Sequence, residues 1–142
     1  MNKKKDYNLF NLAKSIANTS DHHFKVGAVL TYKHKPLRFA SNSATKCDPI
    51  QAKLDFEKYG SYCEGKLHAE SAVLIPYIKR RIDISGAEIY IYRCMRNGKS
   101  GLARPCSSCM KLIKMCKIKK IHYSTYDGFA TETIKYGEKT DE

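Results

Sequence analysis

The stretch "ARPCSSCMKLI", residues 103–113, carries the clearest chemical signal in the chain. It places Cys106 and Cys109 in a Cys-x-x-Cys pair directly after Pro105, at the head of an apolar-periodic run. A proline in the first turn is typical of a helix N-terminus, and the partial positive charge there favours thiolate over thiol. Both sulfurs can then face one point, so the stretch predicts part of a metal site on a helix.

The remaining protein ligand is expected at the start of another element. Zinc prefers four tetrahedral ligands drawn from thiolate, imidazole and carboxylate groups, and a catalytic site keeps one position for water. Of the five histidines, His68 alone stands at the expected start of a helix, in the triplet "HAE". Glu70 follows two positions later, where we expect its side chain to point into a cavity. We therefore predict that His68, Cys106 and Cys109 bind Zn²⁺.

Length and composition limit the class of protein. The chain has 142 residues, of which 42% are hydrophobic and six are cysteines. This length suits a single domain over residues 1–142. The basic N-terminus is not followed by the apolar segment of a secretory signal, and no apolar run approaches the roughly 20 residues of a membrane span. We expect a cytoplasmic protein whose thiols bind metal or stay reduced.

The hydrophobic pattern predicts a mixed sheet layered with helices, an α/β protein. Helices are expected at residues 6–20, 50–59, 67–81 and 105–117. Pro76 lies inside the third of them and predicts a kink or a split. Strands are expected at residues 24–32, 36–44, 86–94, 118–125 and 129–136, with a Gly-rich basic loop at 95–104. Asp127-Gly128 predicts a two-residue hairpin turn between the last two strands.

With "HAE" at 68–70 and "PCSSC" at 105–109, the chain resembles the cytidine deaminase-like superfamily of zinc deaminases, which includes the cytidine and deoxycytidylate deaminases. The resemblance implies a three-layer α/β/α cytidine deaminase-like fold with a central mixed five-stranded sheet. It implies hydrolytic replacement of an amino group by oxygen, with Zn²⁺ activating water and Glu70 as the catalytic proton carrier. It also implies substrate contacts from Asn42 and from the backbone around Ala69, and a homo-oligomeric assembly.

Charge bears on the substrate. The net charge of +12 favours an anionic partner. Four cations precede the two cysteines of the predicted zinc site: Arg93, Arg96, Lys99 and Arg104. We expect them to line the rim of the active site, where they could hold a phosphate. We predict a free (deoxy)cytidine nucleotide or nucleoside as substrate, whose cytosine becomes uracil with release of ammonia, and we expect no membrane partner.

Two alternatives stay open from the residues. The first is a nucleic-acid editing deaminase, which would act on cytosine or adenine in single-stranded DNA or tRNA. The phosphate backbone of that nucleic acid could follow Lys111, Lys114 and Lys117, although a solvated helix face has the same pattern. A non-catalytic zinc-binding subunit is a third reading, which the presence of Glu70 disfavours. Deoxycytidylate deaminases often hold a second, structural zinc, and whether Cys47 and Cys63 bind one also stays open.

Overall fold

The structure is a computed structural model that describes residues 3–60 and 65–136. The helices are α1 (Lys3–Ala17), α2 (Pro49–Tyr59), α3 (Ala69–Arg80) and α4 (Ser107–Met115). The strands are β1 (Lys25–Tyr32), β2 (Lys35–Ser41), β3 (Glu88–Cys94), β4 (Ser100–Gly101), β5 (Lys120–Ser124) and β6 (Phe129–Thr133). The predicted helices and strands are therefore all present, with ends that differ by a few residues.

The strands form one mixed sheet in the order β2-β1-β3-β5-β6. β3 and β5 run parallel, whereas the β1–β2, β1–β3 and β5–β6 pairs are antiparallel. These five strands confirm the predicted sheet. β4 adds a sixth strand inside the stretch expected to be a loop, because Ser100 and Gly101 pair with Cys94 and Arg93 of β3. The basic stretch thus returns along β3 instead of projecting freely.

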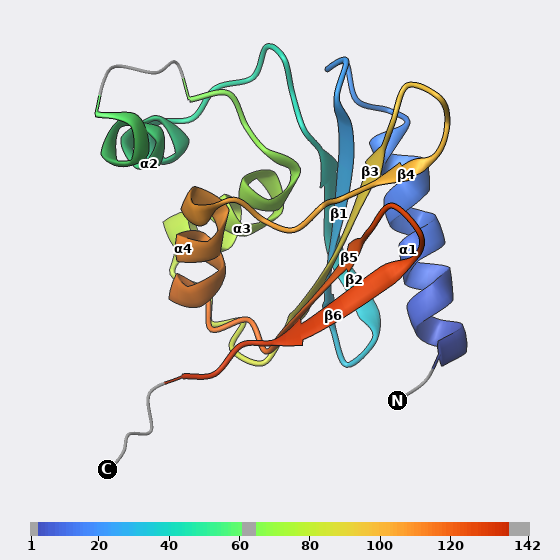
Figure 1. Ribbon diagram of the computed structural model, residues 1–142. Coiled ribbons are helices and arrows are strands. Elements are labelled where there is room, and N and C mark those ends of the chain that lie inside the picture. Colours follow the sequence, from blue (N-terminus) through green and yellow to red (C-terminus); the bar gives the residue numbers. More distant parts are fainter. Residues whose placement is uncertain (1–2, 61–64, 137–142) are drawn as a thin grey trace.

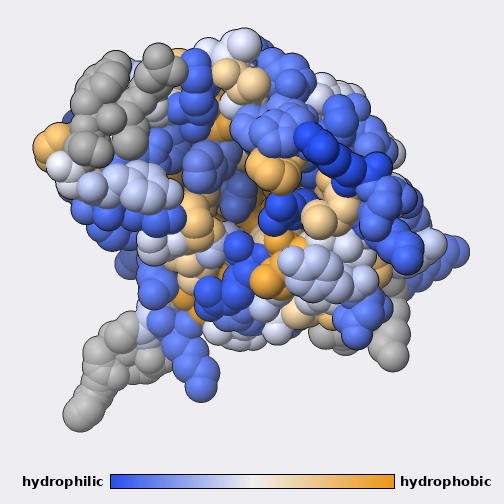
Figure 2. Space-filling view, turned by 45° about the horizontal axis from the view of Figure 1, so that its top comes forward, coloured by the Kyte–Doolittle hydropathy of each residue, from blue (hydrophilic) through white to orange (hydrophobic). Residues whose placement is uncertain are grey.

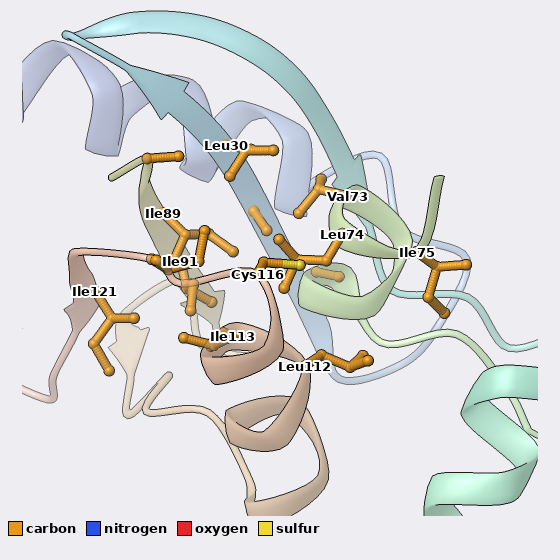
Figure 3. Close-up of a cluster of buried hydrophobic side chains, with 14 of the residues drawn as sticks. Leu30, Val73, Leu74, Ile75, Ile89, Ile91, Leu112, Ile113, Cys116 and Ile121 are labelled. Atoms are coloured by element: carbon orange, nitrogen blue, oxygen red, sulfur yellow. The ribbon is translucent and has the colours of Figure 1, made fainter. Parts of the chain in front are cut away.

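Helices cover both faces of the sheet, which confirms the three layers (Figure 1). α1 packs on one face, where Phe10, Ala13 and Tyr90 belong to one buried cluster. α3 and α4 pack on the other face, where Leu30, Leu74 and most other large apolar side chains gather, as Figure 3 shows. Adjacent residues of β1 enter opposite clusters because successive side chains of a strand point to opposite faces. α2 lies beside α4, outside the sheet layers (Figure 1).

Two local predictions differ from the structure. α3 runs through Pro76 without a break, so of the kink or split predicted there the split does not occur. The burial of Val73, Leu74 and Ile75 on the same helix favours continuing it past the hydrogen bond that Pro76 lacks. The β5–β6 turn is closed by a 2.8 Å hydrogen bond from Thr125 N–H to the carbonyl of Gly128. The turn is therefore centred one residue earlier than predicted, and Gly128 does not adopt a positive φ.

Helix length also bears on membrane partners. Within residues 3–60 and 65–136, none of the helices combines the length and the apolar character needed to cross a bilayer.

Candidate active site

His68, Cys106 and Cys109 come together where α3 and α4 begin. His68 directly precedes α3, and its backbone N–H donates to Ser71 Oγ at 2.9 Å. Cys106 precedes α4 and Cys109 lies in its first turn. His68 Nδ1 is 3.3 Å from Cys109 Sγ and 3.8 Å from Cys106 Sγ. The two helix N-termini that the sequence singled out thus converge on one point.

The three side chains fit a zinc ion. Their ligand atoms all lie within 4.8 Å of one another. A tetrahedral zinc at about 2.0 Å from nitrogen and about 2.3 Å from sulfur requires nitrogen–sulfur separations of about 3.6 Å, which the two observed distances bracket. One imidazole and two sulfurs also leave a fourth position open, as in catalytic zinc sites. The donor set and its spacing are therefore compatible with Zn²⁺.

The two thiols are electrostatically unequal. Hydrogen bonding from Cys109, and then from His68, holds the pKa of Cys106 far below that of an ordinary thiol. The same hydrogen bond to Cys106, together with burial, raises the pKa of Cys109. The Cys106 contact in turn raises the pKa of the His68 imidazole. The shared hydrogen bond thus makes Cys106 the more acidic of the two thiols, and a bound metal would displace the protons of the thiols that it binds.

Glu70 lies in the first turn of α3, beside the cluster. It is 7% exposed, and burial raises the pKa of its carboxyl while the neighbouring His68 charge opposes that rise. Its side chain lines the same cavity as His68 and Cys106. A carboxyl whose pKa is raised in this way is suited to take up and release a proton beside the cluster.

A cavity of about 650 Å³ opens at the cluster. The molecular face in Figure 2 is hollowed near its centre, where hydrophobic residues show between hydrophilic ones. The three residues predicted to contact substrate, Asn42, Ala69 and Arg104, all line this cavity. The structure therefore brings every predicted site residue to one place, although their surroundings differ.

The Asn42 amide holds two strand ends together. Its Oδ1 accepts hydrogen bonds from the Val26 N–H at 2.9 Å and from Ser20 Oγ at 2.7 Å. Its Nδ2 donates to the carbonyl of Phe24 at 2.6 Å. This is the role of a strand-end cap, and it leaves one N–H of the amide for a ligand.

The predicted rim cations fall into two groups. Arg93 and Arg104 line the cavity, whereas Arg96 and Lys99 are not among the lining residues. Arg104 is bound to Glu132, with Nε–Oε2 at 2.6 Å and Nη2–Oε1 at 3.0 Å. The Arg93 guanidinium lies 5.2 Å from the centre of the Phe24 ring, and no acidic partner for it is recorded in the part of the chain that the structure describes. Arg93 is therefore the better placed of the two for an anionic ligand.

Sequence reasoning missed an aromatic group at this cavity. His22 and Phe24 line it. The His22 and His23 rings stack with centroids 5.1 Å apart, and the Phe24 ring is tilted by 42° against the His23 ring, with centroids 4.1 Å apart. We call these three residues the aromatic platform. The tripeptide "HHF" directly before the first strand was a signal for it, because residues that precede a central strand lie at the edge of the sheet.

The remaining buried histidine and the cysteines of the insertion lie apart from the cluster or outside the described residues. His122 is buried on the α1 side of the sheet, with Nε2 2.6 Å from Glu88 Oε1 and Nδ1 2.8 Å from Thr131 Oγ1. Cys47 is exposed. Cys63 lies outside the described residues, so the structure does not test whether these two cysteines bind a second zinc.

Comparison with known proteins identifies the family. The family described as "Cytidine and deoxycytidylate deaminase zinc-binding region" matches residues 3–125. No curated protein matches the sequence significantly. Two solved structures of a dCMP deaminase from the cyanophage S-TIM5 share this fold, each with a TM-score of 0.59. The apo form is 21% identical and the alignment covers 88% of this chain and 86% of that one; the form in complex with dCMP and dUMP is 22% identical, with 87% and 82% covered. The chain therefore belongs to the cytidine and deoxycytidylate deaminase family and is a hydrolytic deaminase.

Proposed function

We propose that the protein is a zinc-dependent hydrolase that converts the cytosine of a free (deoxy)cytidine nucleotide to uracil and ammonia. The observation that carries this proposal is the cluster of His68, Cys106 and Cys109 in one cavity with the buried carboxyl of Glu70. Zinc in this cluster would supply the positive charge that makes water nucleophilic at neutral pH.

The protein's own residues would perform the proton transfers. Glu70 would take a proton from the attacking water and deliver it first to the ring nitrogen and then to the departing amine. The raised pKa of its buried carboxyl favours holding that proton between the two deliveries. His68, Cys106 and Cys109 would hold the metal in this scheme, each at or near a helix N-terminus.

Two further groups are suited to bind the base and the sugar. The N–H of Ala69, the first residue of α3, has no acceptor within the helix, because the first four N–H groups of a helix lack one. We assign it to the carbonyl oxygen of the base. The remaining amide N–H of Asn42 would donate to the sugar. Both residues line the cavity.

Arg93 favours a nucleotide over a bare nucleoside. Its guanidinium lies over Phe24 at the cavity without a recorded carboxylate partner in the described residues, so a substrate phosphate would supply the missing anion. The cyanophage enzyme of the same fold has been solved with dCMP and dUMP, which supports a monophosphate as the first substrate to try.

A deamination panel on zinc-loaded protein tests the proposal. The panel holds cytidine, deoxycytidine, their mono- and triphosphates, adenosine, single-stranded DNA and tRNA, and mass spectrometry detects the replacement of amino by oxygen. We expect turnover of a cytidine nucleotide, and none by the Glu70→Ala variant with its zinc retained. Full activity of that variant would refute the assigned proton carrier, and inactivity of the wild type on every cytosine compound would refute the function.

The aromatic platform favours one second candidate. Stacked rings beside Arg93 at the mouth of the cavity are the type of surface on which single-stranded nucleic acids stack their bases. An editing deaminase acting on single-stranded DNA or tRNA would use the platform for a base next to the target. Turnover confined to the polymers of the panel, with strong salt dependence, would favour this candidate.

A further inference from the structure

Asp55 is a carboxylate at the cavity for which the proposed mechanism has no use. It lies on α2, is 9% exposed, and lines the cavity together with His68 and Glu70. Its Oδ1 accepts a hydrogen bond of 2.9 Å from Nε2 of Gln51, one turn earlier on the same helix. Gln51 is fully buried, so the carboxylate is held by a group that is itself fixed by packing.

No ion pair of the Asp55 carboxylate is found within residues 3–60 and 65–136, where Gln51 donates a hydrogen bond to it. The Oε1 atom of Gln51 is also buried and has no hydrogen-bond partner there. Burying a carboxylate without a cation is costly, and charged side chains are seldom buried unless they are paired or bind a ligand. The free oxygen of Asp55 is thus available to a hydrogen-bond donor that enters the cavity.

Packing places Asp55 near the metal cluster. The chain that leads to His68 lies directly on the first turn of α2: the Asp48 N–H donates to the carbonyl of Gly65 at 3.0 Å. A Cβ at Gly65, which has φ +75°, would stand 2.7 Å from the backbone nitrogen of Ala52. Asp55 follows Ala52 by one turn, on the same side of the helix.

We infer that Asp55 is a second catalytic carboxylate, which accepts a hydrogen bond from the amino group of the reacting carbon, and that Gln51 is its positioning residue. The inference rests on the proposed function. The reacting carbon must lie at the cluster, whereas Arg93 and Asn42 are the groups assigned to the phosphate and the sugar in the same cavity. The substrate donor that comes closest to Asp55 is therefore the amine.

The carboxylate would act on the leaving group. The oxygen of water bonds to the carbon, the carbon–nitrogen bond breaks, and the nitrogen leaves as ammonia with a proton from Glu70. Positive charge develops on that nitrogen as it takes up the proton. A fixed carboxylate beside it stabilises this charge more than it stabilises the neutral amine, which accelerates the chemical step.

The test compares two ligands in the full-length, zinc-loaded Glu70→Ala protein, which binds without turnover. Calorimetry measures the Kd of dCMP and of the 2-pyrimidinone nucleotide, which lacks the amino group. Adding Asp55→Ala is expected to weaken dCMP binding by roughly tenfold or more, since a charge-assisted hydrogen bond is lost, and to leave the analogue within about twofold. Asp55→Asn, which keeps an oxygen acceptor, should weaken dCMP binding less than Asp55→Ala does. Gln51→Leu should also weaken the binding of dCMP more than that of the analogue.

Glu57→Gln is the matched control, because Glu57 is an exposed carboxylate of the same helix that faces Lys111 at 3.6 Å. It should change neither Kd. Equal losses for the two ligands, or loss of zinc from Asp55→Asn by metal analysis, would overturn the inference alone. Failure of the Glu70→Ala protein to bind dCMP, together with failure of the wild type to deaminate it, would overturn the proposed function and the inference with it.

Discussion

Arg104 and Glu132 meet at two points, with Nε–Oε2 at 2.6 Å and Nη2–Oε1 at 3.0 Å. Tyr123 donates to the same carboxylate at 2.6 Å. This arrangement joins the rim of the cavity to the edge strand β6. A guanidinium held in this way is neutralised by its own protein, so Arg104, one of the four cations predicted to hold a phosphate, is less available to a phosphate than Arg93.

Arg93 should therefore determine nucleotide binding more than Arg104 does. We expect Arg93→Gln to raise the KM for a cytidine nucleotide by roughly tenfold or more, the effect of one lost charge-assisted contact, and to leave the KM for the nucleoside nearly unchanged. Arg104→Gln should raise the nucleotide KM far less. Steady-state kinetics with the nucleotide and the nucleoside check this. A larger rise in the nucleotide KM from Arg104→Gln than from Arg93→Gln would show that Arg104 binds the phosphate.

The Arg104–Glu132 pair should make stability depend on pH at the acid end. Hydrogen bonding to Arg104, and then to Tyr123, lowers the pKa of Glu132. A lowered folded-state pKa stabilises the fold above the ordinary glutamate value of about 4.3, and this contribution is lost as the pH falls through the lower, folded-state value.

Denaturant unfolding of wild type and Glu132→Gln from neutral pH down to about pH 3 measures this contribution. The wild type should be the more stable above the ordinary glutamate pKa, and the difference should shrink on acidification. The pair is largely solvent-exposed, so the difference should be small. A difference that grows with acid would contradict the assignment.

The cysteines should differ sharply in reactivity in metal-free protein. Cys106 is partly exposed and its pKa is lowered by Cys109 and His68, so we expect iodoacetamide to modify it at pH 6. Cys116 is buried, and burial raises its pKa to about 11, so it should resist. Peptide mass spectrometry after timed alkylation ranks the two. Added zinc should protect Cys106; continued rapid alkylation in zinc-saturated protein would speak against its role as a ligand.

The contact between α1 and β1 should tolerate no added methyl group at Gly27. A Cβ there would stand 2.3 Å from the carbonyl oxygen of Ala13 and 2.5 Å from the backbone nitrogen of Ala17. Because both obstacles are backbone, Gly27→Ala should destabilise the protein by about 1–3 kcal/mol or more. Gly128→Ala is the control, since nothing lies within 4 Å of its Cβ position. Thermal unfolding compares the two variants. Equal unfolding midpoints would show that α1 moves to accommodate the added methyl group with little loss of stability.

The order of elements and the meeting of His68, Cys106 and Cys109 were predictable because their signals are local. Helix and strand periods appear within a few residues, and a proline followed by Cys106 and Cys109 marks a helix start by itself. The two converging helix N-termini then follow from a recurring pair of motifs. The incorrect position of the turn at Asp127-Gly128 also concerns neighbouring residues. The register of β5 against β6 centres this hairpin turn one residue earlier than predicted.

The use of each charged side chain was decided only by the tertiary structure. Arg93 and Arg104 look alike in sequence, but Glu132 reaches one of them because β6 folds back along β5. Asp55 reads as an ordinary residue of an amphipathic helix until the packing of Gly65 against α2 brings it to the cavity. Such pairings depend on contacts between segments that are distant in the chain. Local signals in the sequence thus predicted the elements and the candidate zinc ligands, whereas long-range packing decided which charged side chains are paired within the protein.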